Sequence, residues 1–392
     1  MPIIILFLAI AIVVSIAGMI INPNVNLISQ ADQKQEEQMV KTQQAKTSAG
    51  SKTGSSGSKS ATQPQTSDSG LNTYIIYNSA SPVVFSETNT VFFDFDAVIP
   101  SSINKNDVYF ETKIEGLDSD WQTTNEKKRE VIFPGGSKSY TFQVRARTSK
   151  EIDPSPAQRT ITINVSPYLG KIEISQVDRT GADFNPSLIK LTANINQGAS
   201  LNITGWKLKA SRGSFLIPGG TKTYQLSSSG NINLYYGDGV YISSASGPFG
   251  SNPNAFRLNR CMGYLKSSYN FKISVPSNCP TASPNSFPSY LQNSCKDYIL
   301  TLESCKQATY QGLESYKLTG DDTCRDYIDS NFTYGGCLSS HSSDSDFTEN
   351  EWHIYTNRQD REIMDINSDT VYLYDQNGLF IDKYCYGSQS CS

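Results

Sequence analysis

A chain of 392 residues has room for two or three domains of ordinary size. Its 33 basic and 37 acidic residues leave a net charge of −4, so no basic surface for nucleic acid or anionic lipid is expected. The two histidines, His341 and His353, offer little material for general-base or zinc chemistry. We therefore expect no enzymatic activity and no nucleic-acid partner.

The first 22 residues are predicted to be a transmembrane anchor. Residues 3–21 carry no charge and would form a helix about 28 Å long, enough to cross the hydrocarbon core of a bilayer. A cleavable signal peptide is the alternative, because Ser15 and Ala17 are small residues at the spacing that a signal peptidase requires. Cleavage after Ala17 would release a secreted protein. The lack of Lys and Arg before the apolar run, and its continuation to Ile21, favour the anchor.

Residues 23–70 are predicted to be a disordered linker. They are rich in Gln, Ser, Gly and Lys and hold too few apolar side chains to bury a core. Lys34 and Lys41 lie just beyond the anchor and weakly favour a cytoplasmic position for the C-terminal domains. The cysteines further along the chain favour translocation more strongly. We expect a single-pass protein of the cell membrane whose C-terminal domains lie outside the cytoplasm.

All the cysteines lie at or after position 261. Their number is even, none forms a C-x-x-C pair, and no histidine lies at zinc-finger spacing, which favours disulfide bonds over a metal site. Many pairings are possible, so the connectivity stays open, although the last two cysteines enclose a small loop and could pair with each other. The cysteines predicted to form disulfides are Cys261, Cys279, Cys295, Cys305, Cys324, Cys337, Cys385 and Cys391.

Residues 71–167 are predicted to form a first β-sandwich, because short apolar runs alternate there with turn residues. Phe93 and Phe95 are expected to face the core, and Asp94 and Asp96 the solvent. A later run alternates in the same way, and its apolar members are Tyr140, Phe142, Val144 and Ala146.

This segment resembles the Y_Y_Y module, a fibronectin-type-III-like domain of bacterial sensor ectodomains. The module has the pattern E-G-x-D-x-x-W, then a proline-glycine turn that leads into Y-x-F-x-V-x-A. The matching residues are Glu115, Gly116, Asp118, Trp121, Pro134, Gly135, Tyr140, Phe142, Val144 and Ala146. In that family the module is a structural spacer beside a propeller. This chain has no propeller repeats and no kinase, so no signalling role is expected.

Residues 168–387 are predicted to form a second β-sandwich. In its first half, Ile203, Trp206 and Leu208 precede an Ile-Pro-Gly-Gly turn at residues 217–220. This arrangement resembles the lamin-tail domain, an immunoglobulin-like sandwich. We expect Trp206 to be a core anchor between the two sheets.

Residues 369–384 resemble the closing hairpin of the same domain. Asn377 and Gly378 lie between two alternating strands and predict a type I′ turn, which needs positive φ at both positions. Between the two halves lies an insertion, at about residues 248–350, that ordinary lamin-tail domains lack. No partner of that family is therefore carried over to this chain.

The insertion contains a short internal repeat. Cys295-Lys-Asp-Tyr-Ile and Cys324-Arg-Asp-Tyr-Ile share one pattern, and each follows residues that favour a helix start. Cys295, Tyr298, Ile299 and Leu302 fall on one face of a helix. We expect two short helices, each held by a cysteine on its buried face, in a segment too polar to form a core without disulfides. A cysteine-bearing insertion of this kind resembles those of membrane-anchored surface proteins of uncultured bacteria.

An acidic cluster, made of Asp344, Asp346, Glu349 and Glu351, lies near the end of the insertion. It could bind Ca²⁺, but it lacks the glycine and the terminal spacing of an EF-hand loop, and a solvated loop is the alternative. The chain also lacks phosphate-loop, nucleophile-elbow and zinc-protease motifs. No cofactor and no metal ion are therefore expected.

These features predict a membrane-tethered, non-enzymatic protein of the cell surface that acts in adhesion or recognition. The insertion would be its binding head, since long insertions in rigid scaffolds usually carry binding. Its partner would be a surface protein or a glycan. A passive structural component of the envelope is one alternative, and an extracellular hydrolase with a carboxylate pair in the insertion is another.

Overall fold

The computed structural model describes residues 70–76, 83–179, 186–223, 228–250, 253–359 and 361–391, which belong to one compact unit, Ser67–Ser392. The predicted anchor, and the predicted linker as far as residue 69, lie outside the described residues. In the part of the chain that is described, no helix combines the length and the apolar composition needed to cross a membrane. The predicted domain boundary near residue 167 stays a prediction.

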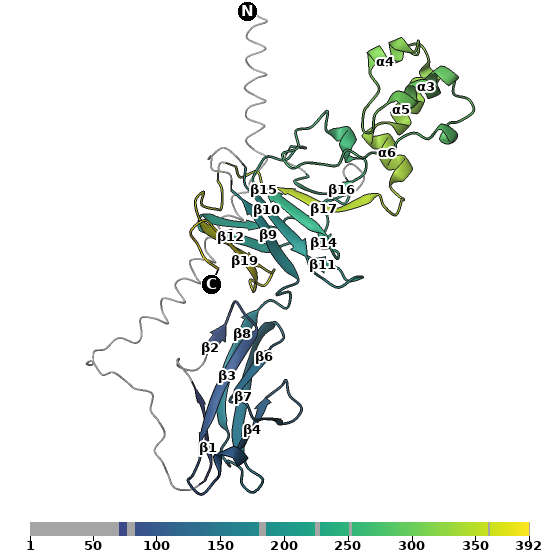
Figure 1. Cartoon of the computed structure of the whole chain (residues 1–392). Coiled ribbons are helices and arrows are strands. Elements are labelled where there is room, and N and C mark those ends of the chain that lie inside the picture. The colour runs from purple at the N-terminus through teal and green to yellow at the C-terminus, as the bar shows by residue number, and fades with distance from the viewer. Residues whose placement is uncertain are drawn as a thin grey trace, which may run out of the picture. The chain divides into compact units, whose positions relative to one another are not determined.

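The first part of this unit is a β-sandwich (Figure 1). One sheet has the strand order β1-β3-β6, and the other runs β8-β7-β4-β5 with β2 beside β8. The buried side chains of both sheets form one core. The elements are β1 (Asn72–Ile76), β2 (Val83–Phe85), β3 (Thr90–Val98), η1 (Lys105–Asp107), β4 (Tyr109–Ile114), β5 (Gln122–Thr124), β6 (Lys128–Ile132), β7 (Gly136–Arg147) and β8 (Ala157–Val165).

Strand alternation builds this core as predicted. Phe93 and Phe95 of β3 are buried, and the ring of Phe93 stacks on Phe142 of β7 with centroids 4.1 Å apart. On the other face of β3, Asp94 is exposed, and Asp96 forms an ion pair with Lys127 at 2.8 Å. The two aspartates therefore lie on the solvent side of the sheet. The predicted inward face of β7 is also buried and consists of Tyr140, Phe142, Val144 and Ala146.

The residues of the E-G-x-D-x-x-W pattern build the turn after β4. Gly116 has a φ of 79°, which a side chain rarely allows. Asp118 accepts hydrogen bonds from the Ile114 amide at 2.7 Å and from the Arg129 guanidinium at 2.8 and 2.9 Å. Burial alone raises the pKa of Asp118, but these hydrogen bonds outweigh it and hold the pKa below its usual value. The Arg145 guanidinium lies 4.1 Å from the Trp121 ring. Gly116, Asp118 and Trp121 thus each have a structural role in this turn.

The second part of the unit is another β-sandwich. One sheet has the order β16-β17-β15-β10-β9, in which β15 and β17 are parallel. The facing sheet has the strand order β13-β12-β18-β19. One residue pair, Phe380 of β19 with Val165 of β8, connects this sheet to the second sheet of the first sandwich. The elements are β9 (Ile172–Asp178), β10 (Leu188–Ala193), β11 (Leu201–Asn202), β12 (Lys207–Ala210), β13 (Gly213–Leu216), β14 (Asn233–Leu234), β15 (Gly239–Ser243), β16 (Ala255–Asn259), β17 (Thr348–Tyr355), β18 (Asp369–Tyr374) and β19 (Phe380–Tyr386).

Trp206 is the core anchor that was predicted for this sandwich. Its side chain is buried in one cluster with Ile203 and Leu208. Its ring stacks on Tyr168 with centroids 5.6 Å apart. From the facing sheet, the Trp352 side chain joins the same cluster, and a Cβ added at Gly220 would lie 2.6 Å from its ring. The second glycine of the Ile-Pro-Gly-Gly turn is therefore required by close packing.

The prediction of a type I′ turn in the closing hairpin is wrong. Gly378 has a φ of 75°, but Asn377 does not have positive φ. The Asp375 carboxylate accepts hydrogen bonds from the amides of Asn377 and Leu379, at 2.8 and 3.0 Å, and its carbonyl accepts one from Gly378 at 3.0 Å. Because this side chain satisfies the amides of the loop, only the glycine position takes up the left-handed conformation.

The insertion is shorter than the predicted range of residues 248–350. Strand β16 lies inside that range, yet it is part of the sandwich, where Phe256 pairs with His353 of β17. The inserted segment is therefore residues 260–347, which connect two neighbouring antiparallel strands. The boundary was misplaced because β16 is short and its partner lies far along the chain. The insertion contains η2 (Met262–Leu265), η3 (Pro284–Ser286), α3 (Asn293–Thr301), α4 (Tyr310–Ser315), α5 (Asp322–Asn331) and α6 (Tyr334–His341).

Candidate functional site

The two ends of the insertion are held together where they leave the sheet. Asn259 of β16 pairs with Thr348 of β17. One residue further out, the Arg260 amide donates to the Phe347 carbonyl at 3.0 Å, and the Arg260 guanidinium forms an ion pair at 2.7 Å with Asp346. A disulfide between Cys261 and Cys337 closes the segment above these contacts. The insertion is therefore a closed loop on a rigid pair of strands.

All eight cysteines form disulfides, and none is free. The two repeated segments are joined to each other, because the cysteine of α3 pairs with that of α5. The cysteines that enclose the small C-terminal loop also pair, which confirms that part of the prediction. The four bonds are Cys261–Cys337, Cys279–Cys305, Cys295–Cys324 and Cys385–Cys391. This complete pairing is typical of an oxidising compartment outside the cytoplasm.

The insertion has two parts (Figure 1). Each part has a core of its own. The base, residues 260–279 and 333–347, shares a core with Phe256 and Tyr355 of the sandwich sheet. The head, residues 280–332, has its own small core around the buried bond between α3 and α5. The bond between Cys279 and Cys305 joins the head to the base. The head is thus an independently packed unit with a fixed attachment.

The two predicted helices of the head are confirmed. Cys295, Tyr298 and Ile299 of α3 are buried on one face, and Leu302 at its end is partly buried. At the start of α5, the Asp321 side chain is the N-cap. It accepts a hydrogen bond of 3.0 Å from the backbone amide of Cys324.

Large apolar side chains lie on the surface of the head. Tyr290 is 64% exposed and Tyr310 is 67% exposed. The Tyr327 ring lies edge-on to Phe287, with centroids 6.4 Å apart. Burial raises the pKa of Tyr327, and the neighbouring Tyr290 raises it further. Exposed tyrosine is enriched in protein-binding surfaces because it offers contact area at a low cost in conformational entropy.

A groove lies between the sandwich and the base of the insertion. Its cavity has a volume of about 290 Å³. The side chains of Glu349 and Glu351, from the predicted acidic cluster, line it. Both point to the same face of β17 because they are two residues apart in a strand. The remaining lining comes from β10, β15 and the loop of the base that contains Pro276, and the whole set is Lys190, Thr192, Gly237, Gly239, Tyr241, Leu258, Pro276, Glu349, Asn350 and Glu351.

The other two residues of the acidic cluster have partners of their own. Asp344 lies 2.8 Å from His341 Nδ1, and Asp346 pairs with Arg260 at the base. The structure therefore does not bring the four acidic side chains together. Over the described ranges, no group of three or more His, Cys, Asp or Glu side chains is arranged to hold a metal ion. Sequence reasoning missed the groove, although the alternation of Glu349 and Glu351 along a strand was a signal for it.

His353 is buried beneath this groove. Its ring lies 5.6 Å from that of Tyr241 and 5.9 Å from that of Phe256, and its Nε2 is 3.4 Å from the Glu351 carboxylate. Burial lowers the pKa of His353 below its usual value of 6.5. The neighbouring Glu351 carboxylate acts in the opposite direction but offsets this effect only in part. The imidazole therefore stays neutral at pH 7 and orients the Glu351 side chain.

Acid should destabilise the second sandwich through this histidine. The unfolded chain takes up a proton near pH 6.5, whereas the folded chain resists protonation until lower pH. Stability is thus fully present above pH 6.5 and falls as the pH drops towards the folded pKa. We expect the melting temperature of the His353→Phe variant to fall less between pH 7 and pH 5 than that of the unmodified chain. The half-buried His341, replaced in His341→Gln, is the control, and equal acid sensitivity of all three chains would contradict the prediction.

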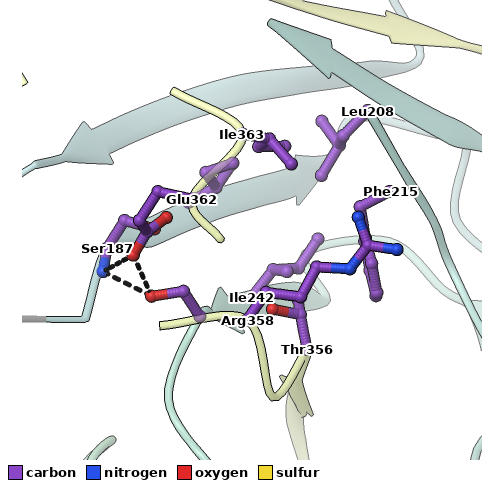
Figure 2. A pocket seen from close by; sticks show the side chains of 10 residues that line it. Ser187, Leu208, Phe215, Ile242, Thr356, Arg358, Glu362 and Ile363 are labelled. Atoms are coloured by element: carbon purple, nitrogen blue, oxygen red, sulfur yellow. Dashed lines mark hydrogen bonds between the residues drawn. The ribbon is translucent and has the colours of Figure 1, made fainter. Parts of the chain in front are cut away.

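A second cavity, shown in Figure 2, is structural. Its volume of about 20 Å³ holds roughly one water molecule. The Glu362 carboxylate accepts hydrogen bonds from the Ser187 hydroxyl at 2.7 Å and from the Ser244 hydroxyl. Arg358 donates to the Ser214 carbonyl at 2.8 Å. These bonds hold the loop after β17 against the ends of β10 and β15 and against β13, and the space is too small for a ligand.

No protein-family model matches the chain, and no curated protein matches it. Parts of it are similar to solved structures, each with a TM-score of 0.18. One is the extracellular domain of a hybrid two-component system from B. thetaiotaomicron, with 20% identity over 24% of this chain and 15% of that one. A second is the structure of domains FN1–FN3 of chicken CNTN1, with 7% identity over 40% of this chain and 54% of that one. A third is chitinase ChiA74 from Bacillus thuringiensis, with 11% identity over 43% of this chain and 25% of that one. At these scores no activity or partner is transferred to this chain.

The fold is that of a mainly β protein, and its disulfides are typical of an oxidising compartment outside the cytoplasm. Two sandwiches form most of the described residues, and disulfides that include every cysteine stabilise the insertion and the C-terminal end.

Proposed function

We propose that this protein is a non-enzymatic recognition or adhesion protein of the cell surface, whose head contacts the partner. The observation that carries the proposal is the construction of the head. It has its own core and its own disulfide, it is attached to a rigid base, and it presents Tyr290 and Tyr310 to solvent. Tyrosine is enriched in protein-binding surfaces and among the residues that contribute most to binding.

The roles proposed for the N-terminal segments and for the two sandwiches are based on the sequence. Residues 3–21 would tether the protein to the membrane, and residues 23–70 would separate it from the surface. The first sandwich would be a Y_Y_Y-type spacer, and the second a lamin-tail-like scaffold for the insertion. In this arrangement the partner is a surface protein or a glycan.

The test compares two pairs of exposed tyrosines in a binding screen against surface proteins and glycans. We expect the variant Tyr290→Ser with Tyr310→Ser to bind at least tenfold more weakly than the unmodified, oxidised chain, which corresponds to about 1.4 kcal/mol. The matched control is Tyr235→Ser with Tyr236→Ser, because these side chains are 44% and 57% exposed on the sandwich. The control should bind normally.

Three other outcomes would overturn the proposal. Equal binding by both variants would show that the head is not the contact surface. No saturable ligand in either screen would favour a passive component of the envelope. Turnover of aryl glycosides, abolished by Glu351→Gln, would favour a hydrolase, since Glu349 and Glu351 line one groove and glycosidases act through a pair of carboxyl groups.

A further inference from the structure

The head is joined to the base on two sides. On one side, α5 of the head leads into α6 of the base through residues 332–333, and the two helices pack closely, because a Cβ added at Gly336 would clash with the Ser330 carbonyl. On the other side, the chain enters the head at Cys279, and the bond from this residue to Cys305 ties down the segment that follows α3. The apolar cores of head and base are separate. The position of the head is therefore set by one helix junction and one disulfide.

Several contacts hold Cys305 against the base. Its Sγ accepts a hydrogen bond of 3.1 Å from the Cys279 amide, and the neighbouring Ser304 hydroxyl donates to the Cys279 carbonyl at 2.9 Å. Gly263 of η2 provides the space for the sulfur, because a Cβ at this position would clash with Cys305 Sγ. We call these four residues, Gly263, Cys279, Ser304 and Cys305, the clasp.

Of the three disulfides in the insertion, the bond of the clasp is the most open to a reductant. Cys305 is half-buried and Cys279 is 4% exposed, whereas the four cysteines of the other two bonds are at most 1% exposed. Reduction begins when a thiolate reaches one sulfur of the bond, so a fully buried disulfide is protected. Cys305 is therefore the point of attack in the insertion.

The backbone at Cys305 also favours opening of the clasp. Its φ of 63° lies in the left-handed region, which costs free energy for a residue with a side chain. No other cysteine in the described ranges has positive φ. Release of the sulfur from its partner lets this residue relax. Strained or exposed disulfides are the ones that are readily reduced and that serve in regulation.

We propose that the Cys279–Cys305 bond is a redox-controlled clasp. A dithiol reductant opens it before the other two disulfides of the insertion, and the head then swings on the junction between α5 and α6. The head keeps its own core and its internal bond during this motion. The inference concerns how the head is attached, so it goes beyond the proposed function and does not depend on what the head binds.

The opening takes two exchange steps. One thiolate of the dithiol attacks Cys305 Sγ, the bond between the two cysteines breaks, and Cys279 leaves as a thiolate. The second thiolate of the dithiol then attacks the reductant sulfur that is bound to Cys305. Cys305 leaves as a thiolate, which the Cys279 amide stabilises. The dithiol is oxidised to a cyclic disulfide, and its two protons pass to the cysteines.

The first test measures the order of reduction. The full oxidised chain is incubated with increasing concentrations of dithiothreitol, free thiols are alkylated, and each cysteine is followed by peptide mass spectrometry. We expect Cys279 and Cys305 to be alkylated at a dithiothreitol concentration at least tenfold lower than the cysteines of the two buried bonds. The exposed C-terminal bond is the internal reference for an accessible disulfide. Reduction of the clasp together with the Cys295–Cys324 bond, or after it, would overturn the proposal.

The second test measures the motion by single-molecule energy transfer. Dyes are attached through azide-bearing amino acids at Tyr236 of the sandwich and Tyr310 of the head, which are 57% and 67% exposed. We expect one narrow distance distribution in the oxidised chain and a clearly broader one at the concentration that opens the clasp. An unchanged distribution after reduction would show that the α5–α6 junction holds the head without the clasp.

Two variants separate the clasp from the other accessible bond. Cys385→Ser with Cys391→Ser should respond to dithiothreitol as the unmodified chain does. Cys279→Ser with Cys305→Ser should give the broad distribution without reductant and should not change when dithiothreitol is added. If this second variant does not fold, the reduction of the unmodified chain still decides the question. Loss of the response in the C-terminal variant would assign the motion to the other bond and contradict the proposal.

Discussion

Replacing Cys261 and Cys337 together by serine should lower the free energy of opening of the base by about 4 kcal/mol. This bond closes a loop with a sequence separation of 76 residues, so its loss returns a large conformational entropy to the open state. Both cysteines are also buried in the core of the base, where serine hydroxyls would have to be accommodated. Amide hydrogen exchange in η2 and α6 should therefore become faster, by roughly a thousandfold.

The matched control is the variant Cys385→Ser with Cys391→Ser. This bond spans a separation of only 6 residues, and Cys391 is exposed. Its loss should cost roughly 2 kcal/mol by the same loop-entropy argument and should affect only β19 and its end. If η2 and α6 kept their protection without the Cys261–Cys337 bond, the base would be held by its apolar core alone, and the prediction would be wrong.

Trp206→Ala should destabilise the second sandwich by about 3–5 kcal/mol, the usual cost of a large aromatic truncation in a core. The side chain is 1% exposed and packs with Ile203 and Leu208. Its removal also ends the stacking on Tyr168. Guanidinium denaturation followed by far-ultraviolet circular dichroism measures the loss.

Trp121→Ala provides the comparison within the same chain. This ring is half-buried and lies beneath the Arg145 guanidinium, a cation–π contact that contributes about 0.5–1 kcal/mol at partly exposed sites. The expected cost is therefore below about 2 kcal/mol. Equal losses for the two variants would mean that Trp206 does not anchor the core.

The base and the head of the insertion differ in how they are joined to the sandwich. The base is continuous with the sandwich core through Phe256 and Tyr355, so it cannot change without affecting the scaffold. The head has a separate core and one internal disulfide, so its surface residues can change independently. Such a division favours recognition by the head.

Features with a local period were predictable from the sequence. The inward face of β7, which begins with Tyr140, follows from the two-residue period of a strand. The buried face of α3, with Cys295 and Tyr298, follows from the 3.6-residue period of a helix in the same way. The turn at Asn377 was mispredicted because the Asp375 side chain forms hydrogen bonds to the loop amides, which the Asn-Gly pair alone does not reveal.

The sequence by itself determined the strand-rich class of the fold, the two helices of the head and the oxidising compartment, because each depends on residues close together in the chain or on composition. Only the tertiary structure decided which cysteines pair, that β16 belongs to the sandwich, and that Tyr241, Pro276 and Glu351 share one groove. These features depend on contacts between residues far apart in sequence. Such contacts form when the sheets close around their core, and no local pattern encodes them.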